Sequence, residues 1–230
     1  MVVALAAYRI AWMPLPKAAC SSVKEALARI DPAVTVPDAP TTHSWHQIYP
    51  TRRFRPHRWQ GYGDHWRFCV VRDPLERLLS VYTNRVVQHR DLWNSRRLRD
   101  DPAFRDLPRD PDPDTFFQQL PRYRLASSAI RHHAFPAWVF LGPELRDYDR
   151  VFRVAELDAL AAALTERTGR WVVMPRRNRS AERLSADDLR PATLAALRAL
   201  LAEEYDYLSG VYQNPLGAPL MALARSGGGN

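Results

Sequence analysis

Two stretches of the sequence repeat the same order of strand, turn and helix, and this repetition constrains the fold more than any other feature. Residues 3–12 are mostly apolar and run into the turn "PLPKAAC", after which apolar residues recur at helical spacing as far as Ile30. Residues 66–71 (WRFCVV) run into "RDP", and the apolar side chains of 75–86 then share one helical face. Strands that alternate with helices form a parallel sheet covered by helices on both faces. The sequence therefore predicts the α/β class.

The second half of the sequence continues this alternation. Residues 148–157 predict a third strand, and the alanine-rich segment 156–168 predicts a helix that Gly169 ends. Residues 170–175 (RWVVMP) are a candidate fourth strand. We expect one domain over residues 1–220 and a disordered, glycine-rich tail at 221–230, with further helices near 115–120, 127–141 and 191–207.

Charge indicates the class of partner without identifying it. The chain of 230 residues carries 33 basic and 25 acidic side chains, a net charge of +8. A positive protein favours anionic partners such as phosphorylated cofactors, acidic glycans, membrane headgroups or nucleic acid. An arginine-rich composition that reflects a GC-rich genome explains the same charge equally well.

Cysteine content and hydropathy indicate the compartment. Cys20 and Cys69 are the only cysteines, too few for a disulfide framework, and their spacing fits no zinc site. We expect both to be small buried side chains without a redox role. No segment approaches the roughly 20 apolar residues of a membrane-spanning helix, and the apolar start lacks the basic leader of a signal peptide. These features predict a soluble, cytoplasmic protein with no membrane span.

The first two predicted strands each deliver a basic side chain at the carboxyl end, Lys17 after the first and Arg72 after the second. Ligands of α/β sheets bind at this end of the strands, so we expect both side chains at one edge. A turn that opens a helix also presents free backbone N–H groups and the positive end of the helix dipole, which hold phosphate or sulfate. The only other lysine, Lys24, lies within the predicted helix, where we expect it to reach solvent.

Two motifs carry a resemblance to a known family. The segment "LPKAACSSVKEAL" is similar to the 5′-phosphosulfate loop, and "VRDPLERLLSVY" to the 3′-phosphate motif, of carbohydrate sulfotransferases, a family that includes Golgi glycan enzymes and bacterial members. The second motif matches that family at nearly every position. Weaker matches in the same order are "RHHAFPAWVFL", "YDRVFRVAEL" and "RRNRS", so the resemblance covers about residues 5–210.

The resemblance implies a P-loop-like central parallel sheet flanked by helices, which is the sulfotransferase fold. It also implies 3′-phosphoadenosine-5′-phosphosulfate (PAPS) as the sulfuryl donor, without a metal. Lys17 would then follow the charge that grows on the bridging oxygen, and Arg72 and Ser80 would hold the 3′-phosphate. The remaining donor-binding residues implied by the resemblance are Ala18, Ala19, Cys20, Ser21, Ser22, Asn178 and Ser180. For Asn178 and Ser180, a solvated basic loop is an equally good alternative.

An acceptor hydroxyl must lose its proton, and histidine is the most frequent general base. Related enzymes that modify sugar hydroxyls carry a histidine after the first unit, and here His43 and His46 occupy that segment. We therefore expect His43 as the base, with His46 second; a structural role for either residue is the alternative. His132 and His133 are expected to pack on a helix, and Glu76 and Arg77 to be ordinary helix-surface charges.

The function predicted is sulfuryl transfer from PAPS to a hydroxyl of a carbohydrate or glycosylated metabolite. One alternative is a P-loop kinase of a small metabolite, but the first turn lacks the glycines of Gly-x-x-x-x-Gly-Lys-[Ser/Thr], and a clear acidic magnesium ligand after a strand is absent. A second alternative is an arginine-rich nucleic-acid-binding module, although no recognition motif is present, and we expect no nucleic-acid partner. The acceptor pocket is expected in the loops 31–64 and 88–126, whose arginines suggest an acidic acceptor.

Overall fold

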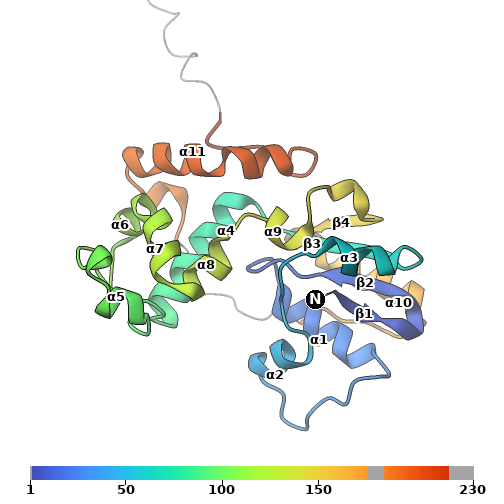
Figure 1. Cartoon of the computed structure of the whole chain (residues 1–230). Coiled ribbons are helices and arrows are strands. Elements are labelled where there is room, and N and C mark those ends of the chain that lie inside the picture. Colours follow the sequence, from blue (N-terminus) through green and yellow to red (C-terminus); the bar gives the residue numbers. More distant parts are fainter. Residues whose placement is uncertain (1, 176–183, 218–230) are drawn as a thin grey trace, which may run out of the picture.

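The computed structural model describes residues 2–175 and 184–217, and its centre is a small sheet (Figure 1). Within the described residues the sheet has four strands in the order β1-β2-β3-β4. Strand β1 pairs antiparallel with β2, whereas β2, β3 and β4 run parallel to one another. The α/β prediction is thereby confirmed; the strands are β1 (Val3–Leu5), β2 (Ile10–Met13), β3 (Trp66–Val71) and β4 (Arg150–Arg153).

The prediction of one long strand over residues 3–12 was wrong. A single 3₁₀ turn, Ala6–Tyr8, and the left-handed backbone of Arg9 (φ 49°) reverse the chain, so that Val3 pairs with Trp12. Both arms of this hairpin are buried and apolar, so their composition is the same as that of one continuous buried strand.

The predicted fourth strand at 170–175 was also wrong, because these residues form no ladder with the sheet. The alternation that suggested a strand is real: Trp171 and Val173 are exposed, whereas Val172 and Met174 are buried. The buried side chains pack into the core cluster beneath α1 (Cys20–Ile30) and α10 (Leu157–Thr168). Side-chain packing therefore produces the alternation here without backbone pairing.

Both faces of the sheet are covered, as parallel strands require. Alternate residues of β2 and β3 enter opposite core clusters, in accordance with the two-residue period of a strand. On one face, Ile10, Trp12, Phe68 and Val70 pack in the cluster that holds α1 and α10. On the other face, Ala11, Met13, Cys69 and Val71 pack with the helices α3 (Pro56–Trp59) and α9 (Trp138–Leu141).

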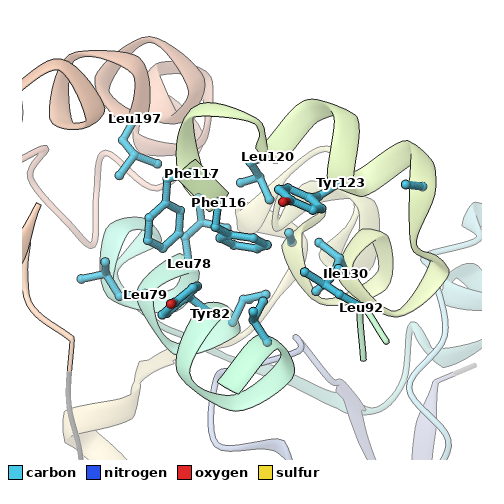
Figure 2. Close-up of a cluster of buried hydrophobic side chains, with 14 of the residues drawn as sticks. Leu78, Leu79, Tyr82, Leu92, Phe116, Phe117, Leu120, Tyr123, Ile130 and Leu197 are labelled. Atoms are coloured by element: carbon cyan, nitrogen blue, oxygen red, sulfur yellow. The ribbon is translucent and has the colours of Figure 1, made fainter. Parts of the chain in front are cut away.

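A second layer of helices lies beside the sheet and has its own aromatic core (Figures 1 and 2). Figure 2 shows Phe116, Phe117, Tyr123 and Tyr82 gathered between these helices, with Leu197 closing the cluster from α11. The predicted helix over 127–141 is divided into α8 and α9, because Pro136 cannot continue the hydrogen-bond ladder. The helices of this layer are α4 (Pro74–Val81), α5 (Arg96–Asp100), α6 (Pro113–Gln118), α7 (Leu120–Ala126), α8 (Ser128–Ala134) and α11 (Pro191–Tyr207).

Arg77 of α4 was predicted to be a surface charge, and this prediction was wrong. Its side chain is fully buried and donates to both carboxylate oxygens of Glu204 on α11, at 2.8 and 3.0 Å. It also donates to the carbonyl oxygens of His133 and Phe135. The Arg77 guanidinium thus connects α4, which carries the second predicted motif, to the end of α8 and to the last turn of α11. Glu76, its neighbour, is exposed as expected.

Candidate anion-binding site

The turn after β2 has the backbone shape of an anion site. Lys17 (φ 67°) and Ala19 (φ 57°) both adopt the left-handed region, which costs a residue other than glycine roughly 1–3 kcal/mol. Ala19 is the N-cap of α1, and no side chain caps that helix end. The turn is fixed from beneath, because the Ala18 N–H and the Cys20 thiol both donate to the Leu15 carbonyl. The N–H groups of the first turn of α1, which have no acceptor within the helix, are thus held at the sheet edge.

Lys17 extends from this turn to the helix that follows β3. Its Nζ donates to Oδ1 of Asn84, which lies in the π-helix (Tyr82–Gln88) that continues α4. Burial, and then the positive charges of Arg85 and Arg72, lower the pKa of Lys17 to about 7. The two basic strand-end residues predicted from sequence, Lys17 and Arg72, therefore lie close enough for the charge of Arg72 to disfavour the Lys17 ammonium.

Arg72 and Ser80 belong to the second motif, and α4 begins where the sequence predicted. Asp73 is its N-cap and accepts from the Glu76 N–H at 3.0 Å, with Pro74 at the first helical position. Arg72 is half-buried, and its Nε donates to a Glu76 carboxylate oxygen at 3.3 Å. Ser80 is half-buried, and its hydroxyl donates to the Arg77 carbonyl at 2.8 Å.

Helix α2 (Thr42–Ile48) brings one of the two candidate histidines to the turn. Nε2 of His46 lies 3.1 Å from Oγ of Ser21 in the first turn of α1. Burial, and then the charge of Lys24, lower the pKa of His46 to about 4, so its ring is neutral at pH 7. His43 lies exposed on the same helix, one turn earlier. The structure thus places His46, and not His43, in contact with the predicted phosphate turn.

Lys24 does not reach solvent, so that prediction was wrong. Its side chain is fully buried, with Nζ 3.0 Å from Nδ1 of His46 and 2.7 Å from Oγ1 of Thr51. Burial lowers the pKa of Lys24 to about 8. The two lysines therefore contact different elements: Lys17, before α1, contacts Asn84 of the π-helix, and Lys24, within α1, contacts His46 of α2.

Three further groups lie near Lys17; sequence reasoning missed Asn84 and Arg85 and gave little weight to His133. Asn84 binds Lys17, and Arg85 lies close enough to lower its pKa while pairing with Asp91 at 2.5 Å. His133 of α8 is the third: burial, then Arg85 and Lys17, lower the pKa of its imidazole to about 2. Its Nδ1 is buried and has no hydrogen-bond partner among the described residues. Only the paired histidines of "RHHAF" marked this position in the sequence, and they gave no sign of proximity to Lys17.

Of the remaining predicted site residues, some are buried at the start of α1 and two lie outside the described residues. Ser22 and Cys20 are buried in the first turn of α1, and Ala18 is buried beneath it. Asn178 and Ser180 lie outside the described residues. Cys20 and Cys69 are free, buried thiols whose pKa values burial raises, as expected of small core side chains. In the described part of the chain, no group of three or more His, Cys, Asp or Glu side chains could hold a metal ion.

Comparison with known proteins agrees with this geometry. The model of a family described as "Sulfotransferase family" matches residues 3–207, which include both motifs and the four strands of the described sheet. The chain belongs to the sulfotransferase family. No curated protein and no solved structure matches it significantly.

The family assignment confirms the resemblance found in the two motifs and the sulfotransferase fold. It supports sulfuryl transfer to a hydroxyl-bearing acceptor as the general activity. None of the described helices of this sulfotransferase is long and apolar enough to cross a membrane.

Proposed function

We propose that this sulfotransferase moves a sulfuryl group from PAPS to a hydroxyl of a carbohydrate or glycosylated metabolite, within one domain spanning residues 1–220. The observation that carries the proposal is the meeting of two motifs at one sheet edge. Lys17, from the turn after β2, contacts Asn84, in the helix that continues from the Arg72 motif after β3. An unsymmetrical anion with phosphate groups at two positions fits such a pair of basic turns.

The donor's 5′-phosphosulfate fits the first turn of α1. Its oxygens would accept from the uncapped N–H groups there, from the hydroxyls of Ser21 and Ser22, and from the Lys17 ammonium. The 3′-phosphate would lie against Arg72 and Ser80. In the described structure the Ser80 hydrogen points to the Arg77 carbonyl, so this contact requires the hydroxyl to rotate. Asn178 and Ser180, which lie outside the described residues, are proposed to bind the donor as well.

The reaction we propose is an in-line displacement at sulfur. The acceptor oxygen forms a bond to sulfur while the bond from sulfur to the bridging phosphate oxygen breaks, and the acceptor proton passes to a histidine. Lys17, protonated when an anion is bound, donates to the bridging oxygen as negative charge grows on it. The leaving group is 3′-phosphoadenosine 5′-phosphate (PAP). His43 is the proposed base, with His46 as the second candidate.

The acceptor is proposed to be acidic, because two cationic side chains lie beside the end of α8. The guanidinium groups of Arg53 and Arg124 lie over the ring of Phe135, at 4.6 and 5.4 Å from its centroid. Arg53 also helps to lower the pKa of His132 on α8. An anionic sugar would be attracted to this positive region. The free, buried thiols fit a reducing compartment, and we propose the cytoplasm.

Thermal unfolding in the presence of nucleotides tests the proposed function. PAP at 100 times its Kd should stabilise the protein by about 2.7 kcal/mol, a rise in Tm of roughly 5–10 °C for a chain of this size. Lys17→Ala and Arg72→Ala should reduce this rise, whereas Arg198→Met, an exposed charge on α11, should not.

Two other nucleotides separate the alternatives. A rise in Tm with ATP and Mg²⁺ but not with PAP or PAPS would favour a kinase. Salt-sensitive binding of DNA without a PAP effect would favour a nucleic-acid module. If millimolar PAP and PAPS both left Tm unchanged, the proposed donor would be wrong.

A further inference from the structure

Lys24 is a buried cation whose described side-chain partners are neutral. Its side chain has no exposed surface, and its Nζ contacts Oγ1 of Thr51 and Nδ1 of His46. Burying an ammonium costs free energy unless its protons are donated in hydrogen bonds or ion pairs. Arginine accounts for 31 of the 33 basic side chains in the sequence, yet the residue at this position is lysine. The lysine ammonium is compact and lies on a flexible stem between α1 and α2, whereas an arginine guanidinium is planar and holds its donors in a fixed fork.

The contacts of Lys24 fix the proton on the neighbouring imidazole. A protonated ammonium has no lone pair, so at the 3.0 Å contact it donates and Nδ1 of His46 accepts. The neutral ring then carries its one proton on Nε2. That nitrogen lies 3.1 Å from Oγ of Ser21, which must accept it. Since the Ser21 oxygen is occupied as an acceptor, its own hydrogen is free to point into the anion turn.

His46 is kept neutral by its surroundings as well as by burial. Among the described residues, the charged and titratable groups that lower the pKa of His46 come from four elements and are all basic: Lys24 of α1, His43 of α2, Arg85 of the π-helix and His132 of α8. With Nδ1 accepting from Lys24 and Nε2 donating to Ser21, neither ring nitrogen has a lone pair left for an incoming proton.

We propose that Lys24 is a positioning residue that holds His46 as the Nε2–H tautomer, so that Ser21 directs its hydroxyl hydrogen to the donor's 5′-phosphosulfate. The chain of donors runs from the Lys24 ammonium through His46 to Ser21, and each hydrogen bond polarises the next. His46 then acts as a hydrogen-bond relay, which leaves proton abstraction to another histidine such as His43. This role rests on the proposed function only in its last step, the contact between Ser21 and the donor.

The tautomer can be observed without any nucleotide. In protein labelled with ¹⁵N-histidine, long-range ¹H–¹⁵N correlation spectra distinguish protonated from unprotonated ring nitrogens, and His46→Gln identifies the signals of His46. At pH 7 we expect a proton on Nε2 alone, and a ring that remains neutral down to pH 5. Lys24→Met should release Nδ1, give a mixture of tautomers and raise the pKa of His46, whereas Arg198→Met should change nothing. A proton on Nδ1 in the unaltered protein would overturn the proposal, and this measurement needs no Lys24 variant to fold.

Kinetics with PAPS and an accepted hydroxyl substrate separate a relay from a structural or basic role. Lys24→Met should lower kcat/KM about 10-fold or more, the loss expected for one buried, charge-assisted hydrogen bond. Lys24→Gln keeps an N–H donor for Nδ1 without the charge, and should recover most of that loss. His46→Gln keeps a donor for Ser21, so we expect about a 10-fold loss, whereas removal of a general base costs about 10²–10⁴-fold.

The outcomes distinguish this proposal from the proposed function. If the unaltered protein bound neither PAP nor PAPS while the Nε2–H tautomer depended on Lys24, the donor assignment would fail and the relay would stand. If PAP bound but Lys24→Gln and Lys24→Met lost activity equally, the relay would be refuted. A loss above 10³-fold in His46→Gln with unchanged PAP affinity would make His46 the base.

Discussion

Binding of the desulfated product should draw a proton from solvent, and Lys17 should be its main destination. Burial and the charges of Arg85 and Arg72 lower the pKa of Lys17 to about 7 in the free protein. A bound phosphate would reverse that shift, because a nearby anion favours the ammonium. Proton uptake on binding is the difference between the two states of this one group.

The size of the uptake follows from the pKa values. At pH 7 a group with a pKa near 7 is about half deprotonated, so binding should take up about half a proton, rising to about 0.9 at pH 8. Lys24, with a pKa of about 8, contributes at most about one tenth of a proton at pH 7. The uptake measured at pH 7 therefore comes mainly from Lys17, whereas at pH 8 Lys24 would add to it. His46 and His133, with pKa values of about 4 and 2, are neutral there.

Isothermal titration calorimetry with PAP, repeated in buffers of different ionisation enthalpy, measures the number of protons taken up on binding. Lys17→Arg is the matched variant, since guanidinium remains charged and should bind PAP with almost no uptake at pH 7. The lowered pKa of Lys17 also affects stability. Between pH 7 and pH 10 the unfolded chain keeps a proton on Lys17, whereas the folded chain has lost it. The Lys17 contribution to stability therefore rises with pH across that interval. Zero uptake in the unaltered protein, or equal uptake in Lys17→Arg, would refute the reasoning.

Two further predictions concern the scaffold. Arg77→Met leaves Glu204 charged, buried and unpaired, and should cost about 3–5 kcal/mol by urea unfolding, while Arg77→Met with Glu204→Gln should recover a large part of this; a single variant within 1 kcal/mol of the parent would contradict the buried pair. Cys20 and Cys69, both buried with raised pKa values, should react with a thiol reagent only after unfolding. Rapid modification of either thiol in the folded protein would show that its burial is incomplete.

Features encoded within a few neighbouring residues could be predicted well. "RDP" before an amphipathic run supplies an N-cap and a first-turn proline, and α4 begins at Pro74 as predicted. The run 66–71 became β3, and the proline-stopped turn delivered Lys17 beside α1. The family resemblance rested on these same segments, because a phosphate-binding turn is a local arrangement of backbone N–H groups.

Other features depend on segments far apart in the sequence. A strand prediction at 170–175 failed because alternating burial arises from packing as well as from pairing, and only the position of the neighbouring strand decides between them. Arg77 reads as a surface charge within its helix, yet its partner Glu204 lies 127 residues away. Burial is a property of what packs against a residue, and local sequence does not specify it.

The sequence by itself determined the α/β class, the two basic turns and the family, because each depends on contiguous segments with a particular order of apolar, proline and basic residues. Only the tertiary structure decided what the two lysines contact. Lys17 meets Asn84 of a second unit, and Lys24, expected in solvent, is buried against His46 and Thr51. The physical reason is that a buried charge is tolerated only where donors and acceptors from separate elements converge on it, and that convergence exists only in the folded chain.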